Sequence, residues 1–233
     1  GGLTNLCFNA VDRHYKSNPN QLALVAVSTE TNQEKAYSFK ELYEEVNRIA
    51  AIYKANGIQK GDRVLIYMPM IAEACFAMLA CARIGAIHSV VFGGFASHSL
   101  ATRIDDAKPK MVVTAEAGMR GGKAVPYKPL LDEAIALATY KPEKVLIVNR
   151  GLSEFTTVAG RDLDYASERQ KHLNDLVPVE WVDATHPSYI LYTSGTTGKP
   201  KGVQRDTGGY AVALMSTMNH IFCGKAGETM FCT

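Results

Sequence analysis

Hydrophobic and polar residues follow short, regular patterns in the first part of the chain. Leu22–Val27 and Lys35–Phe39 are β-type runs on either side of a polar turn, which predicts a hairpin. Ser38 and Glu41 then form a capping-box pattern, and apolar residues recur at helical spacing as far as Gly57. We therefore expect a hairpin followed by a capped amphipathic helix.

The next segments alternate between strand-like and helix-like patterns. Arg63–Met68 and Ala86–Phe92 are apolar strand-like runs, and an almost wholly apolar helix, Ile71–Ile84, lies between them. The alternation is expected to continue with helix Ser97–Ala107, strand Lys110–Ala115, helix Tyr127–Thr139 and strand Lys144–Val148. Apolar strands that alternate with helices predict an α/β fold with parallel-rich sheets flanked by helices on both faces.

The last third of the chain is less regular at first. Gly151–Pro187 contains one expected helix, near Asp162–Leu173, and we interpret this segment as a link between subdomains. It is followed by an expected strand Tyr189–Thr193, a returning strand Gly202–Arg205 and a helix Tyr210–Phe222 with Thr207 near its cap. We predict an N-terminal α/β subdomain at residues 1–177 and the start of a second subdomain at residues 178–233.

Composition narrows the possible classes of protein. The chain is 47% hydrophobic and 21% charged, which is typical of a soluble globular protein. Its net charge of +2 comes from interspersed signs, so there is no basic stripe for nucleic acid. The longest apolar stretch, Ile71–Val91, is interrupted by charged residues, and the N-terminus lacks a signal pattern. We predict a protein that binds neither nucleic acid nor a membrane.

The cysteines and histidines give no sign of a metal or catalytic site. The five cysteines are scattered without a CxxC pair and are interpreted as reduced core thiols of a cytoplasmic protein. They are Cys7, Cys75, Cys81, Cys223 and Cys232. The six histidines show no ligand or triad spacing, so packing or surface roles are expected.

Tyr192–Gly202 reads YTSGTTGKPKG and combines hydroxyl donors, glycines and two lysines. Glycines leave backbone N–H groups accessible, so the stretch is suited to wrapping a triphosphate, with a flexible polar hairpin as the alternative. A Walker loop needs four residues between its first Gly and its Gly-Lys pair, whereas Gly195 and Gly198 are separated by two. GxSxG is absent, so Ser194 is not expected to be a hydrolase nucleophile.

Two further segments follow predicted parallel strands, where such folds bind ligands. They are FGGF at Phe92–Phe95 and AEAGMRGGK at Ala115–Lys123, the second of which is expected to be a loop. In the second, Arg120 and Lys123 lie three apart among glycines and would form a compact cationic site for a phosphate. From the residues alone, Arg120 could equally be a solvated loop cation, and the glycines of FGGF a tight turn.

The motif at Tyr192–Gly202 resembles the phosphate-binding signature of the adenylate-forming superfamily. Other stretches resemble its acetyl- and propionyl-CoA synthetase branch, and the resemblance extends from Gly1 to Thr233. These stretches are GGLTN, CFNAVDRH, HSVVFGGF, AEAGMRGGK and GVQRDTGGYAVAL. The resemblance implies AMP-forming ligation of a short-chain carboxylate, propionate first and acetate next, to coenzyme A through an acyl-adenylate.

The resemblance also implies roles for single residues. The β and γ phosphates of ATP would be held by Thr193, Ser194, Gly195, Thr196, Thr197, Gly198, Lys199 and Lys201. The 3′-phosphoadenosine part of coenzyme A would contact Phe92, Gly93, Gly94, Arg120 and Lys123, although acetyl-CoA synthetases usually carry Arg at the last position. ATP, Mg²⁺ and coenzyme A would act as substrates or activator without being tightly bound.

The same resemblance places the catalytic residues outside this chain. Members of the superfamily carry the carboxylate pocket, the magnesium ligand and the adenylation lysine beyond the position of Thr233. The chain starts with Gly and stops within a strand-like run, so we interpret it as a piece of a longer enzyme that is inactive alone. An exposed sheet edge would allow oligomers. Two alternatives stay open: an adenylation domain that loads a carrier protein, and a non-catalytic nucleotide-binding module.

Overall fold

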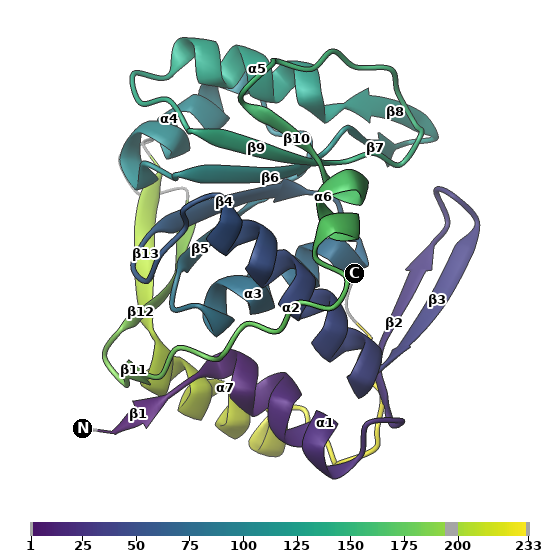
Figure 1. The fold of residues 1–233 in the computed structure, drawn as a ribbon, viewed down its shortest axis with the longest axis vertical. Coiled ribbons are helices and arrows are strands. Elements are labelled where there is room, and N and C mark those ends of the chain that lie inside the picture. Colours follow the sequence, from purple (N-terminus) through teal and green to yellow (C-terminus); the bar gives the residue numbers. More distant parts are fainter. Residues whose placement is uncertain (1, 194–199, 232–233) are drawn as a thin grey trace.

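A mostly parallel β-sheet forms the centre of the protein (Figure 1). The computed structural model describes residues 2–193 and 200–231, and within them the sheet has seven strands in the order β10-β9-β6-β4-β5-β12-β13. The strands are β4 Arg63–Met68, β5 Ile87–Phe92, β6 Met111–Ala115, β9 Lys144–Val148, β10 Asp162–Asp164, β12 Pro187–Thr193 and β13 Lys201–Asp206. Neighbouring strands are parallel except β12 and β13, which are antiparallel. The predicted α/β fold class is confirmed.

Helices cover both faces of this sheet (Figure 1). Helices α2 (Phe39–Ala55) and α3 (Ala72–Arg83) contribute to one buried apolar cluster, and α4 (Ser97–Ala107) and α5 (Tyr127–Leu137) contribute to another. Alternate residues of β4 belong to alternate clusters, because successive side chains of a strand point to opposite faces. The continuous apolar run of β4 therefore supplies two cores at once.

The hairpin and the capped helix near the N-terminus form as predicted. Strands β2 (Leu22–Ser28) and β3 (Gln33–Ser38) pair antiparallel and lead directly into α2. The Ser38 N–H donates to Glu41 Oε2 at 2.7 Å, and the Glu41 N–H donates to Ser38 Oγ at 3.2 Å. Two donors at the helix end are thereby satisfied, as a capping box requires.

The first residues form elements that the sequence pattern did not predict. Strand β1 (Leu3–Thr4) pairs with β11 (Val182–Asp183), and a π-helical turn, η1 (Phe8–Asp12), leads into α1 (Arg13–Ser17). Arg83 Nη1 on α3 donates to both carboxylate oxygens of Asp12, at 2.8 and 3.1 Å, and both side chains are buried. This ion pair attaches the N-terminal segment to the central helices.

Some expected elements differ from those observed. AEAGMRGGK is not an open loop, because β7 (Ala117–Arg120) and β8 (Lys123–Pro126) pair as a hairpin. The helix expected near Asp162–Leu173 is α6 (Tyr165–Lys171), since residues 162–164 pair with β9 as β10. Helix α7 (Thr207–His220) begins earlier than expected. Its glycine Gly208 packs so closely on Ala184 that an added Cβ would lie 2.6 Å from the Ala184 Cβ, so packing explains this glycine.

The cysteines were only partly predicted. Cys7 and Cys81 are buried, and burial raises the pKa of the Cys7 thiol to about 12. Cys223 is exposed just after α7, so its assignment to the core was wrong, and Cys232 lies outside the described residues. Cys223 is exposed because it lies beyond the end of α7, where the backbone turns with a φ of 51° at this residue.

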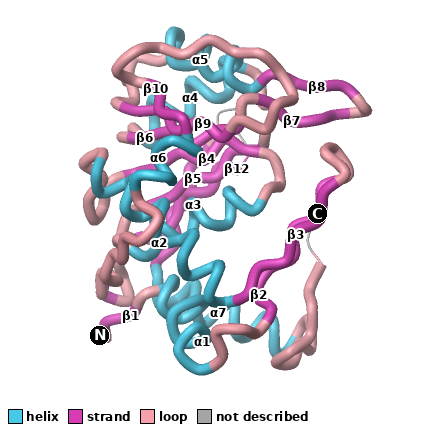
Figure 2. Tube along the Cα trace, turned by 45° about the vertical axis from the view of Figure 1, so that its right-hand side comes forward, coloured by secondary structure: helices cyan, strands magenta, loops and turns pink. Residues whose placement is uncertain are grey.

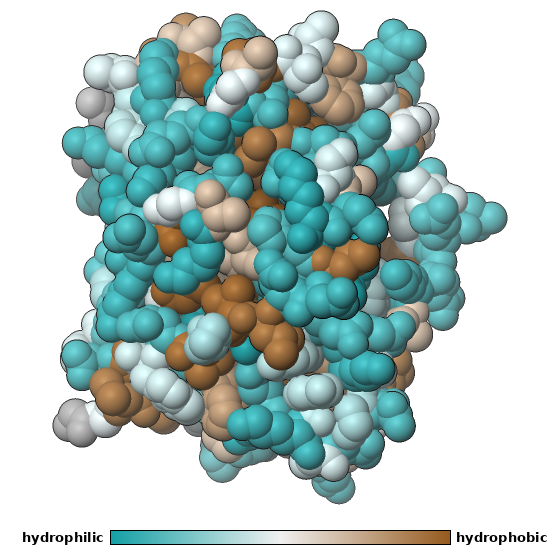
Figure 3. Space-filling view, viewed as in Figure 1, coloured by the Kyte–Doolittle hydropathy of each residue, from teal (hydrophilic) through white to brown (hydrophobic). Residues whose placement is uncertain are grey.

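The surface of the molecule is mostly polar on the side seen in Figure 3. Hydrophobic side chains gather in its lower half, where the segment between α6 and β11 crosses that side (Figures 1 and 3). This segment carries the exposed Leu176 and the half-exposed Trp181, whose ring centroid lies 4.9 Å from that of Phe8. No described helix is long and apolar enough to cross a membrane.

Candidate functional site

The segments predicted to bind ligands begin at one edge of the sheet. Strands β4, β5, β6, β9 and β12 all run parallel to one another in this order of pairing: β9 with β6, β6 and β5 with β4, and β12 with β5. Their carboxyl ends therefore lie along the same edge of the sheet. Gly93 and Gly94 follow β5, the β7–β8 hairpin follows β6, and Thr193 ends β12. This arrangement agrees with the general position of ligand sites in open α/β sheets.

The structure describes the two ends of the YTSGTTGKPKG stretch. Thr193 and Lys201 are register partners on β12 and β13, and both are exposed. The other predicted phosphate ligands lie outside the described residues: Ser194, Gly195, Thr196, Thr197, Gly198 and Lys199. The ends of the stretch are thus brought side by side, and their role in binding phosphate stays a prediction.

Arg120 and Lys123 are brought together at the tip of the β7–β8 hairpin. They are register partners, so their side chains project to the same face of the two-stranded ribbon. Gly121 and Gly122 between them have φ values of 57° and 75°, the left-handed backbone that a two-residue type I′ turn requires. Both cations are exposed, so the hairpin presents a paired positive site to solvent.

The FGGF segment and the hairpin meet at the side chain of Tyr127. A Cβ added at Gly93 would lie 2.5 Å from Tyr127 Oη, and one added at Gly118 would lie 2.3 Å from the same atom. Real Cβ atoms essentially never approach other atoms this closely, so any larger residue at either position requires the Tyr127 side chain to shift. Burial, with a smaller contribution from Glu30, raises the pKa of Tyr127. Phe92 is largely exposed beside this contact, and its ring lies 6.0 Å from that of Phe95.

Three side chains that the sequence pattern did not predict hold the base of the hairpin. The Met119 N–H donates to Glu30 Oε1 at 3.0 Å, and Arg150 Nη2 donates to Glu30 Oε2 at 2.5 Å. Arg150 Nη1 also donates to the carbonyl of Ala117. Glu116 is fully buried and accepts the N–H groups of Arg150 and Leu152, both at 2.8 Å. The hairpin is thereby tied to β2–β3 and to the segment after β9.

Comparison with known proteins identifies the family of the chain. The family model for the AMP-binding enzyme matches residues 11–233. The chain belongs to the AMP-binding enzyme family. Over 232 residues it is 62% identical to the propionate–CoA ligase of Salmonella typhimurium, a match that covers 100% of this chain and 37% of that protein. It is 50% identical over 230 residues to human acyl-CoA synthetase short-chain family member 3, mitochondrial, covering 97% of this chain and 33% of that protein.

A solved structure shows that the similarity of this AMP-binding family member to acyl-CoA synthetases includes its fold. The acetoacetyl-CoA synthetase of Streptomyces lividans matches with a TM-score of 0.83 and 28% identity, covering 94% of this chain and 33% of that chain. The predicted resemblance to acyl-CoA synthetases is therefore confirmed. The chain spans about a third of the length of these relatives, between 33% and 37%.

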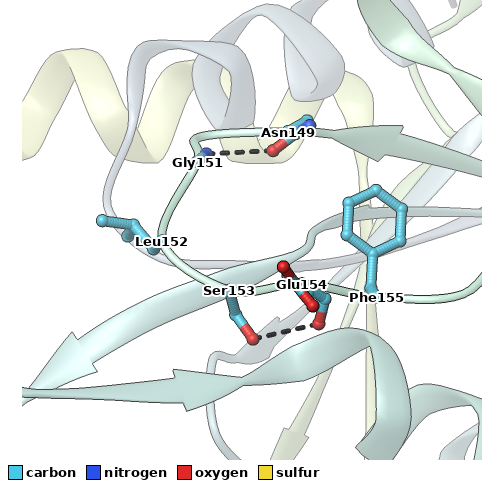
Figure 4. A pocket seen from close by; sticks show the side chains of 6 residues that line it. All are labelled: Asn149, Gly151, Leu152, Ser153, Glu154 and Phe155. Carbon is cyan, nitrogen blue, oxygen red and sulfur yellow. Dashed lines mark hydrogen bonds between the residues drawn. The ribbon is translucent and has the colours of Figure 1, made fainter.

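One surface depression of this AMP-binding family member lies on the segment that follows β9. Its walls are Asn149, Gly151, Leu152, Ser153, Glu154 and Phe155. Figure 4 shows this segment curving around the depression, with the Gly151 N–H donating to Asn149 Oδ1 at 2.9 Å. The lining residues include a carboxylate and no cation, so the depression lacks the positive charge of a phosphate site.

Proposed function

We propose that the chain supplies phosphate-binding parts of an AMP-forming short-chain acyl-CoA ligase, with propionate as the first candidate substrate and acetate as the next. The observation that carries the proposal is the pairing of Arg120 with Lys123 at the tip of a hairpin that packs, through Tyr127 and Val125, against Gly93 and Gly94. The names of the similar bacterial and human proteins support the reaction class and the choice of substrate.

On the coenzyme A side, the hairpin would hold the 3′-phosphate. The Arg120 guanidinium can donate two parallel hydrogen bonds to phosphate oxygens, whereas the Lys123 ammonium acts as a compact point charge. Phe92, Gly93 and Gly94 would lie along the adenosine part, with Phe92 exposed for ring contact. Because Tyr127 fixes the two segments against each other, the phosphate and the adenosine would be bound in a set orientation.

On the ATP side, residues Thr193–Lys199 and Lys201 would surround the β and γ phosphates. When the carboxylate attacks the α-phosphorus, negative charge grows on the departing pyrophosphate, and fixed N–H, hydroxyl and ammonium donors would stabilise it. Mg²⁺ would enter with ATP as part of the substrate. Within residues 2–193 and 200–231 there is no cluster of three or more His, Cys, Asp or Glu side chains that could hold a metal.

We also propose the division into an N-terminal subdomain at 1–177 and the start of a second subdomain at 178–233. Within the seven-stranded sheet the two segments meet where β12 pairs with β5, at Tyr189 and His88. A cytoplasmic location is proposed from the scattered cysteines, although the human relative is named as mitochondrial.

A hybrid enzyme tests the proposed function. In it, this chain replaces the matching 232 residues of the Salmonella propionate–CoA ligase. Carboxylate-dependent ATP–pyrophosphate exchange is measured with acetate, propionate and butyrate, and thioester formation is measured with coenzyme A and with 3′-dephospho-coenzyme A. We expect exchange to be greatest with propionate and to be lost in Lys199→Ala.

The coenzyme A site is tested by substrate comparison in the same hybrid. We expect the unaltered hybrid to prefer coenzyme A over the dephospho form, and the double variant Arg120→Ala with Lys123→Ala to lose this preference while it retains exchange. A hybrid that folds but gives no exchange with any short carboxylate would overturn the ligase assignment. An unchanged preference in the double variant would overturn the assignment of the hairpin.

A further inference from the structure

Arg103 lies between the two candidate ligand segments. It belongs to α4, its residue is 8% exposed, and its guanidinium carbon lies 5.0 Å from the ring centre of Phe95 and 5.3 Å from that of Tyr192. Phe95 ends the FGGF segment, and Tyr192 directly precedes Thr193 of the YTSGTTGKPKG stretch. One buried cation therefore contacts a residue from each segment.

The guanidinium is held in place from its own helix. Its Nη1 donates to the carbonyl and to the hydroxyl of Ser99, one helical turn earlier, at 2.7 and 2.6 Å. Among the described residues no carboxylate forms an ion pair with Arg103. A buried cation without a counter-ion is unfavourable, so the two aromatic faces stabilise it here together with the Ser99 oxygens.

Both aromatic residues are also fixed from another side. Tyr192 Oη donates to Asp106 Oδ2 at 2.6 Å, so α4 holds this ring at two points. The carbonyl of Phe95 accepts from Tyr67 Oη at 3.0 Å, and the Phe95 ring neighbours that of Phe92. A shift of the Arg103 side chain would thus be transmitted to both the coenzyme A side and the ATP side.

We propose that Arg103 is a positioning residue of the ligase, which sets the placement of the FGGF segment relative to the end of β12. The inference rests on the proposed function and adds a residue outside both predicted ligand sets. Its side chain would act by fixing Phe95 and Tyr192 and not by touching a substrate. Because small misplacements of reacting groups lower rates strongly, about 10²-fold for a shift of 1 Å, both half-reactions would depend on it.

The hybrid enzyme separates the two half-reactions. Arg103→Met keeps the length of the side chain and removes its charge, and we expect it to lower kcat for both exchange and thioester formation about 10- to 100-fold, with smaller changes in KM. Tyr192→Leu is expected to lower exchange and Phe95→Leu to lower thioester formation. When Arg103→Met is combined with either change, the fold-loss in rate should be smaller than the product of the two single fold-losses, because the residues in each pair share one contact.

Arg103→Lys retains a cation over the rings and should recover part of both rates. Arg63→Met is the matched control, since Arg63 donates to the carbonyls of Ala107 and Lys108 at the C-terminal end of α4 and forms no cation–π contact with either ring. Thermal unfolding is measured on every variant. If the Arg103 variants lose stability but keep normal kcat and KM per folded enzyme, the positioning role is overturned and the ligase assignment stands. A folded hybrid without exchange overturns both.

Discussion

The backbone N–H of Met119 donates a hydrogen bond of 3.0 Å to Oε1 of Glu30, a residue 89 positions earlier in the sequence. This bond joins the β7–β8 hairpin to the β2–β3 hairpin. The β2–β3 and β7–β8 hairpins project from the same side of the molecule (Figures 1 and 2). The other carboxylate oxygen of Glu30 pairs with Arg150. The direction in which Arg120 and Lys123 point therefore depends on a carboxylate from the N-terminal hairpin.

Glu30→Gln should weaken coenzyme A binding without affecting adenylation. The amide oxygen can still accept from Met119, but the ion pair with Arg150 is lost, so the hairpin tip becomes less well oriented. We expect the KM for coenzyme A in the hybrid enzyme to rise about 5-fold, which corresponds to about 1 kcal/mol. Glu34→Gln, an exposed change on the same hairpin, is the control. An equal loss of ATP–pyrophosphate exchange would contradict this prediction.

Gly118→Ala should destabilise the chain by overpacking against Tyr127. The added Cβ would lie 2.3 Å from Tyr127 Oη, and such overpacking typically costs about 1–3 kcal/mol. Urea unfolding of the 233-residue chain measures the change. Tyr127→Phe removes the nearest atom, so the same substitution should cost less in that background. Gly2→Ala, where nothing lies within 4 Å, should be neutral, and equal effects at both glycines would exclude the steric explanation.

Asp12→Ala should be strongly destabilising, because it leaves the Arg83 charge buried without its partner. Removing one member of a buried ion pair typically costs about 3–5 kcal/mol. The double variant Asp12→Ala with Arg83→Met should recover part of this loss in urea unfolding. Glu180→Ala breaks the exposed pair with Lys60 and should cost about 0–1 kcal/mol. If the two single variants were equally stable, the Asp12 pair would not be the main attachment of the N-terminal segment.

His88 should make the fold less stable in mild acid. Its Nδ1 atom is buried without a hydrogen-bond partner among the described residues, and burial lowers the pKa of His88 to about 4. The unfolded chain takes up this proton near pH 6.5 and the folded chain only near 4, so the stabilisation is complete above pH 6.5 and is lost as the pH falls towards 4. The full loss is about 3 kcal/mol, from about 1.4 kcal/mol for each pKa unit.

Urea unfolding at several values between pH 7 and pH 4 measures this slope, and His88→Gln is the control that cannot titrate. Acidic and basic groups elsewhere contribute equally to both chains, so the difference between the two slopes isolates His88. Parallel curves for the two chains would contradict the prediction.

Local patterns were sufficient for the larger elements of the fold. The capping box at Ser38 and Glu41 and the apolar run of β4 are local sequence patterns, and each can be recognised within its own segment. Strands β1 and β11 have two residues each, too few for any periodicity, and exist because they pair across the chain. The β7–β8 hairpin does carry a local signal, since Gly121-Gly122 is a typical type I′ turn, but a glycine pair between two cations is equally typical of an open loop.

The candidate site was predictable in part for the same reason. Arg120 and Lys123 are close in sequence, so their spacing already suggested a shared anion site. Glu30, Arg150 and Arg103 act through partners on other elements, and no pattern around these residues indicates which groups they meet. Such contacts depend on how the sheet and helices pack, which a single sequence does not encode in any local window.

The side chains allowed at the positions of Tyr127, Gly93 and Gly118 constrain one another. The tyrosine ring fills the space that a side chain at either glycine would need, so a larger residue at one glycine favours a smaller one in place of the tyrosine, and that smaller residue opens a void beside both segments. Among related proteins, a larger residue at either glycine position should therefore occur together with a smaller one at the position of Tyr127. Substitutions at the three positions would therefore be correlated among related proteins, although the positions lie in separate segments of the chain.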